Sequence, residues 1–137
     1  MHPQLTRLEG LDQLSRLIDG SASCPVLLFK HSYSCGISAE ALDELATHLD
    51  DTHAGTTGVT YAMVTVQTHR DVSNAVAKRL GVRHETPQAL LVRDGRVVWS
   101  ASHFRVTARA VHDAISAAMP AQSLAPRPTP TTTPTES

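Results

Sequence analysis

The fold of this chain is decided by the segment VLLFKHSYSCGIS, which occupies residues 26–38. It begins with an apolar run, residues 26–29, that is short enough to form a buried strand. Beyond it, apolar residues recur at the spacing of an amphipathic helix; they are Ile37, Ala41, Leu42, Leu45, Ala46 and Leu49. The pattern predicts a strand, a polar turn and a helix, with Cys35 where the helix begins.

A cysteine in that position is favoured as a nucleophile. The first amide N–H groups of a helix have no intrahelical partners and lie at the positive end of the helix dipole, so they favour a thiolate at Cys35. Lys30 and His31 lie just upstream and could add positive charge. The alternative is a buried, inert cysteine at a strand end.

The motif Cys35-Gly36-Ile37-Ser38 has the spacing of a Cys-x-x-Cys redox pair, with serine in place of the second cysteine. Ser38 can donate a hydrogen bond to the Cys35 thiolate, but it cannot form a disulfide. The remaining cysteine, Cys24, precedes the predicted strand, whose ends lie roughly 17–20 Å apart. A disulfide needs Cα atoms within about 7 Å, so Cys24 is expected to be structural or incidental.

Length and composition limit the possible classes of protein. The chain has 137 residues, which fit one domain, and a net charge of −1 with no basic cluster argues against a nucleic-acid partner. No segment is apolar enough to span a membrane, and the start of the chain lacks the apolar region of a signal peptide. Because there are only two cysteines, we expect a protein of the reducing cytoplasm rather than a disulfide scaffold.

Hydrophobic periodicity and turn residues predict elements in the order α-β-α-β-α-β-β-α. They are a helix over residues 5–18 ending at Gly20, a strand over 25–29, a helix over 37–49, a strand over 59–66, a helix capped by Asp71 and ended by Gly81, a hairpin joining 89–92 to 97–99 through Asp94-Gly95, and a helix around 111–118. Strands separated by a helix run parallel, and a hairpin adds antiparallel strands. The order predicts an α/β, thioredoxin-like fold: a four-stranded mixed sheet flanked by helices on both faces.

The predicted domain covers residues 1–120. Residues 121–137 interleave prolines with threonines, a composition that cannot build a packed core. We therefore expect a disordered tail there and assign it no function.

Thr86-Pro87 stands immediately before the first strand of the predicted hairpin. In the thioredoxin-like layout, a proline at this place usually follows a cis peptide bond and lies against the redox cysteine. The backbone beside it offers an edge with which the backbone of a thiol substrate can pair. The alternative is an ordinary trans proline at a strand start.

Several motifs occur in the same order as in a known family. They are FKHS at residues 29–32, SCGIS at 34–38, VSN at 72–74, GVRHETPQ at 81–88 and WSASH at 99–103. Over about residues 8–118 the chain resembles the monothiol bacilliredoxin family (YtxJ-like proteins). It departs from the family's pattern at Gly36, where members commonly carry proline, and at Phe104, where they often carry tryptophan.

The resemblance implies a bacterial cytoplasmic enzyme that reduces mixed disulfides between proteins and the low-molecular-weight thiol bacillithiol. Cys35, with Ser38 as its catalytic neighbour, would take this thiol from an S-thiolated client protein and be regenerated by another thiol. Substrate-binding residues are then expected at Lys30, His31, Gly36, Ile37, Thr86, Pro87 and His103. We expect a monomer with no metal, cofactor, nucleic acid or membrane as partner. A second function class stays open: a non-catalytic thioredoxin-like binding or redox-sensing module that uses the Thr86-Pro87 edge.

The eight histidines show no metal-ligand spacing. Four of them are expected to be solvated: His48, His53, His69 and His112. Three could lie near Cys35 or make structural hydrogen bonds: His31, His84 and His103. Arg83 and Arg105 could attract the negatively charged malate part of bacillithiol or stay solvated.

Overall fold

The computed structural model describes residues 3–52 and 58–118. The elements in chain order are β1 (Leu5–Arg7), α1 (Leu11–Asp19), β2 (Val26–His31), α2 (Gly36–Thr52), β3 (Thr60–Thr65), α3 (Arg70–Leu80), β4 (Gln88–Arg93), β5 (Arg96–Ser102) and α4 (Ala108–Ala118), with 3₁₀ turns at Gly20–Ala22 and His103–Arg105. Within this part of the chain, no helix is long and apolar enough to cross a membrane. The predicted tail at residues 121–137 and His53 lie outside the described residues.

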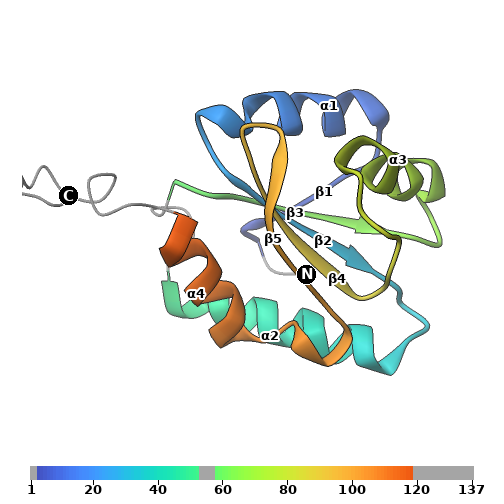
Figure 1. The fold of residues 1–137 in the computed structure, drawn as a ribbon. Coiled ribbons are helices and arrows are strands. Elements are labelled where there is room, and N and C mark those ends of the chain that lie inside the picture. The colour runs from blue at the N-terminus through green and yellow to red at the C-terminus, as the bar shows by residue number, and fades with distance from the viewer. Residues whose placement is uncertain (1–2, 53–57, 119–137) are drawn as a thin grey trace, which may run out of the picture.

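The strands form one mixed sheet in the order β1-β3-β2-β4-β5. β3 runs parallel to both β1 and β2, while β4 is antiparallel to β2 and β5. Helices α1 and α3 cover one face of the sheet, and α2 and α4 cover the other (Figure 1). The predicted α/β arrangement with helices on both faces is confirmed, except that the sheet has five strands instead of four.

The additional strand is β1, where hydrophobic periodicity predicts the start of a helix. Leu5 pairs with Tyr61 of β3, and Gly10 is extended immediately before α1 begins at Leu11. Leu5 and Leu8 are both buried, but they belong to cores on opposite faces of the sheet. One helical stripe cannot face both cores, so the helix prediction was wrong for this segment.

Strand β2 is the centre of the sheet and is buried along its whole length. Leu27 and Phe29 pack on the side of α2 and α4, while Leu28 packs on the side of α1 and α3. Such burial on both faces is typical of a central strand between two helical layers. The chain leaves this strand at His31 and reaches Cys35 at the same end of the sheet.

The turn residues behave as their chemistry predicts, with one exception. Gly81 ends α3 with a left-handed φ of 66°, and the hairpin turn has positive φ at Asp94 and Gly95, 55° and 75°. The Thr86-Pro87 peptide is cis, as predicted. The exception is Asp71, which lies in the first turn of α3 rather than capping it, because the helix begins at Arg70 and His69 occupies the N-cap position.

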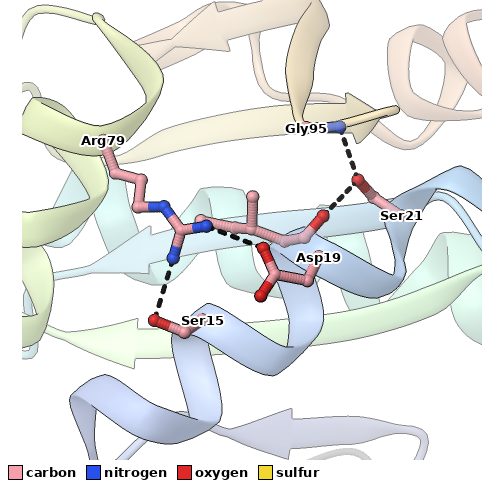
Figure 2. Close-up of polar contacts among 6 residues, drawn as sticks. Ser15, Asp19, Ser21, Arg79 and Gly95 are labelled. Atoms are coloured by element: carbon pink, nitrogen blue, oxygen red, sulfur yellow. Dashed lines mark hydrogen bonds and ion pairs between the residues drawn. The ribbon is translucent and has the colours of Figure 1, made fainter.

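Polar contacts tie the helices on one face to each other and to the hairpin (Figure 2). Arg79 of α3 donates to the hydroxyl of Ser15 and pairs with the carboxylate of Asp19, each at 2.8 Å. Ser21 is buried, and its hydroxyl accepts the N–H of Gly95 in the hairpin turn at 2.7 Å. These contacts join α1, α3 and the hairpin turn into one layer on the face opposite α2.

His48 is buried, so the prediction that it is solvated was wrong. Its side chain is 3% exposed, and its Nε2 lies 2.9 Å from the hydroxyl of Tyr61. Burial is the main reason that the pKa of His48 is lowered. The burial depends on a residue distant in the sequence. The hydroxyl of Tyr61 on β3 contacts the imidazole inside the core, and a polar group with a hydrogen-bond partner can be buried at low cost.

Candidate active site

Cys35 lies between the end of β2 and the start of α2, and its side chain is half-buried. Its carbonyl accepts the N–H of Ala39 at 3.1 Å, so Cys35 stands where the helix begins, as predicted. The amides of Gly36 and Ile37 belong to the first turn, where N–H groups lack partners within the helix. They place positive partial charge at this end of α2.

Ser38 is fully buried, and its hydroxyl joins the start of α2 to the end of β2. Its Oγ lies 2.7 Å from Nδ1 of His31 and accepts the N–H of Ser32 at 3.0 Å. In the part of the chain that the structure describes, these hydrogen bonds engage Ser38, and none links it to the Cys35 sulfur. The hydrogen bond from Ser38 to a Cys35 thiolate therefore stays a prediction.

His31 is buried at the end of β2, and its ring stacks on that of Phe29 with the centroids 6.0 Å apart. Burial lowers the pKa of His31, which favours the neutral imidazole at neutral pH. A neutral imidazole keeps one acceptor nitrogen, and Nδ1 is placed to accept the hydroxyl hydrogen of Ser38. The structure thus brings His31 and Ser38 together beneath the turn that carries Cys35.

Gln67, which follows β3, holds the loop before Cys35. Its Nε2 donates to the hydroxyls of Ser32 and Ser34 at 2.6 and 3.0 Å, and its Oε1 accepts the N–H of Tyr33 at 3.3 Å. No sequence motif identifies Gln67 as a site residue. Its only signal is its place just after a strand parallel to β2, because the carboxyl ends of parallel strands meet at one edge of the sheet.

Pro87 lies beside the end of β2. Gln88 pairs with Lys30 in the antiparallel register, so Pro87 comes next to His31 on the adjacent strand. The Pro87 carbonyl accepts the N–H of His103 at 3.0 Å, which ties the 3₁₀ turn after β5 to the proline. The proline, the 3₁₀ turn and the strand that leads to Cys35 therefore meet at one end of the sheet.

The chain is similar in sequence and structure to known redox proteins. Residues 6–111 match the family described as Monothiol bacilliredoxin BrxC. The chain belongs to the monothiol bacilliredoxin family. A structure solved as a candidate oxidoreductase with a thioredoxin fold is 30% identical to this chain, with a TM-score of 0.70 over 80% of this chain and 92% of the other.

Thioredoxins share the fold of this bacilliredoxin at lower identity. Thioredoxin of Malassezia sympodialis (Mala s 13) is 18% identical with a TM-score of 0.65, covering 82% of this chain and 89% of its own. Oxidized mitochondrial thioredoxin 3 of Saccharomyces cerevisiae is 18% identical with a TM-score of 0.62, covering 82% of this chain and 94% of its own. The predicted thioredoxin-like fold is confirmed.

Lys30 of this bacilliredoxin lies on the α1 and α3 side of the sheet, away from α2. Its side chain is 0% exposed; its Nζ donates to the Ser73 carbonyl at 3.3 Å and lies 2.6 Å from Nδ1 of His84. Burial lowers the pKa of Lys30 to about 8. The substrate contact of Lys30 stays a prediction. Through His84, the lysine contacts the loop that leads to Pro87.

The bacilliredoxin's cysteines are both free thiols and stand at opposite ends of β2. The Cys24 sulfur donates to the carbonyl of Gly58 at 3.0 Å and lies 3.2 Å from the hydroxyl of Thr60, at the start of β3. Cys35 follows the other end of the strand. This arrangement agrees with the prediction that Cys24 is structural or incidental.

Cavities adjoin the 3₁₀ turn of the bacilliredoxin on two sides. One, of about 350 Å³, brings together the predicted site residues Ile37 and His103. The other, of about 400 Å³, is lined by Glu85, Arg105 and the serines of β5, and His103 and Phe104 line both cavities. No three His, Cys, Asp or Glu side chains within residues 3–52 and 58–118 gather in a way that could hold a metal ion.

Proposed function

We propose that this chain is a monothiol thiol-disulfide oxidoreductase that removes bacillithiol from S-thiolated client proteins through Cys35. The observation that carries the proposal is the half-buried Cys35 at the start of α2, in a chain of the monothiol bacilliredoxin family. The helix N–H groups there favour a thiolate, which is the attacking form of a cysteine in disulfide exchange.

The reaction is two successive thiol–disulfide exchanges. The Cys35 thiolate attacks the bacillithiol sulfur of the mixed disulfide, and the client cysteine leaves as a thiolate that takes a proton from water. A disulfide now joins Cys35 to bacillithiol. A second thiolate from solution attacks the bacillithiol sulfur of this adduct, forms a new disulfide with it and releases the Cys35 thiolate. Electrons and protons balance without a cofactor.

The second exchange needs an external thiol because the chain offers no resolving group near Cys35. Ser38 occupies the place of a second cysteine and cannot form a disulfide. Cys24 stands beyond the far end of β2. Strand β2 is six residues long, so its ends are about 17 Å apart, well beyond the roughly 7 Å that a disulfide allows between Cα atoms.

Substrate would be held by the backbone and side chains at the end of the sheet where Cys35 lies. The Thr86-Pro87 backbone supplies an edge for pairing, and Gly36, Ile37 and His103 border the same end of the sheet. Arg105 lines the cavity on the other side of the 3₁₀ turn, where a guanidinium suits the carboxylates of bacillithiol's malate part.

The proposal is tested with a client protein carrying bacillithiol on one cysteine. The reduced chain should release the thiol from the client and carry one bacillithiol, located on Cys35 by peptide mass spectrometry. Cys35→Ser should abolish the transfer, while the matched control Cys24→Ser should retain it. Transfer by Cys35→Ser at the wild-type rate would refute the enzymatic function. It would instead favour the alternative, a non-catalytic module that binds through the Thr86-Pro87 edge.

A further inference from the structure

The cavity between the start of α2 and the 3₁₀ turn has an apolar wall and an acidic rim. Ile37, Phe104 and Val106 supply apolar surface, and Phe104 is 72% exposed, the largest exposed fraction of any large apolar side chain in the described residues. An exposed aromatic ring beside a cavity of about 350 Å³ is typical of a surface that contacts a partner.

The rim carries carboxylates on one face of α2. Glu40, Asp43 and Glu44 line the cavity, and His103 is the only basic residue that lines it with them. Glu44 already accepts the N–H of Ala108 at the start of α4, at 2.8 Å. Glu40 and Asp43 are exposed, and the ion pairs found in the described residues leave both without a basic partner. The rim is therefore negatively charged near neutral pH.

This cavity lies at the end of the sheet where the chain reaches Cys35. Ile37 is two residues beyond Cys35, and the backbone of His103 is bonded to Pro87. A molecule whose disulfide meets Cys35 can therefore place a neighbouring side chain in this cavity. Bacillithiol is anionic and would be repelled by Glu40 and Asp43, whereas a cationic side chain would be attracted to them.

We propose that this cavity is a docking site for the client protein, which places an apolar side chain against Phe104 and Ile37 and a lysine or arginine beside Glu40 and Asp43. The inference rests on the proposed function and adds a preference to it: clients with basic and apolar residues next to the thiolated cysteine are reduced fastest. The Arg105 cavity, on the other side of Phe104, is left for the anionic thiol.

The experiment uses two bacillithiolated peptides that differ only in flanking residues, leucine with lysine in one and leucine with glutamate in the other. The wild type should show a higher kcat/KM for the basic peptide, by at least about threefold at low salt, and the ratio should shrink at high salt. The double variant Glu40→Lys, Asp43→Lys should lose or reverse this preference. The matched control Glu9→Lys, Asp12→Lys makes the same change of charge at the start of α1, across the sheet, and should keep the wild-type ratio.

A second variant tests the apolar contact. The measured ratio is kcat/KM for a peptide divided by kcat/KM of the same protein for a small mixed disulfide of bacillithiol, which offers no side chain to the cavity. Phe104→Ala should lower this ratio about fivefold for both peptides. Because Phe104 is largely exposed, its removal should change the unfolding temperature little. An undiminished ratio for Phe104→Ala would contradict the apolar half of the docking site.

The outcomes separate the docking site from the chemistry. Reduction of the small disulfide with equal kcat/KM for both peptides would overturn the docking site and leave the proposed function standing. No reduction of any disulfide would refute the proposed function. In that case the affinity of the Cys35→Ser chain for the peptides still decides the docking site: tighter binding of the basic peptide supports it, and equal binding overturns it.

Discussion

Nδ1 of His31 lies 2.7 Å from Oγ of Ser38, which joins the last residue of β2 to the first turn of α2 across the loop that carries Cys35. Both side chains are buried, and the Ser32 N–H also donates to the same oxygen. Ser38 is therefore more than a serine in place of a second cysteine. Its hydroxyl fixes the start of the helix against the sheet and so sets the position of the sulfur.

Ser38→Ala should lower the free energy of unfolding by about 1–3 kcal/mol, because it leaves the Ser32 amide and the His31 nitrogen buried without a partner. The measurement is urea unfolding. Ser34→Ala is the matched control. Because Ser34 is exposed, water can replace its hydroxyl as the acceptor for Gln67, so this variant should change the free energy of unfolding by no more than about 0.5 kcal/mol. Equal stability of Ser38→Ala and wild type would contradict the proposed role of the hydroxyl.

Gly36 tests how much the backbone donors of α2 contribute to the reactivity of Cys35. An added Cβ at Gly36 would meet no atom within 4 Å, so alanine has room at this first helical position, and it is a position that proline favours. Gly36→Pro should stabilise the fold by about 0.4–1 kcal/mol, because proline restricts the unfolded chain and suits the start of a helix.

Proline also removes the Gly36 N–H, whereas Gly36→Ala keeps it. At neutral pH the proline variant should alkylate at Cys35 about two- to fivefold more slowly than the alanine variant, since a helix-end interaction is typically worth about 0.3–1 kcal/mol. Iodoacetamide labelling followed by mass spectrometry measures this rate, with Cys24 as an internal reference. Identical rates would mean that this amide does not stabilise the thiolate.

Lys30 should make stability depend on pH in the alkaline range. The pKa of Lys30 is about 8 in the folded protein, and its ordinary value, 10.5, applies to the unfolded chain, where the side chain is not buried. Between these two pH values the unfolded chain holds a proton that the folded chain has lost. Stability from this group therefore rises as pH increases from 8 to 10.5, and the penalty of burying the ammonium is fully present below pH 8.

The Lys30→Met variant lacks this titration. Relative to the variant, the wild type should gain up to about 3 kcal/mol of unfolding free energy across that range. Unfolding by urea at several pH values measures the difference, and subtraction removes the contributions of other groups. A constant difference between the two proteins would show that the lysine ionises as it does in water.

Cys24 should take no part in regeneration. If the reduced chain is treated with bacillithiol disulfide, the adduct on Cys35 should persist until an external thiol is added, and Cys24→Ser should change neither its yield nor its lifetime. Intact mass spectrometry follows the adduct. Rapid conversion to an internal disulfide would contradict the external-thiol mechanism and the separation of the cysteines by β2.

The local sequence determined much of this protein. The apolar run that ends at Phe29, the helical spacing from Ile37 onward and the Asp94-Gly95 turn each predict a structure that the chain adopts, because their signals depend on neighbouring residues. The cis peptide at Thr86-Pro87 was also predicted, from its place before the hairpin. Together these features sufficed to place Cys35 at a helix start.

Only the tertiary structure decided the features that depend on distant partners. Leu5 lies in a strand because Tyr61 pairs with it across more than fifty residues, and the same spacing of leucines would suit a helix. His48 is buried because Tyr61 meets it in the core. The face on which Lys30 lies follows from the register of the sheet, because successive side chains of a strand point to opposite sides. Periodicity reports which residues are apolar; the pairing of distant segments decides what each polar side chain touches.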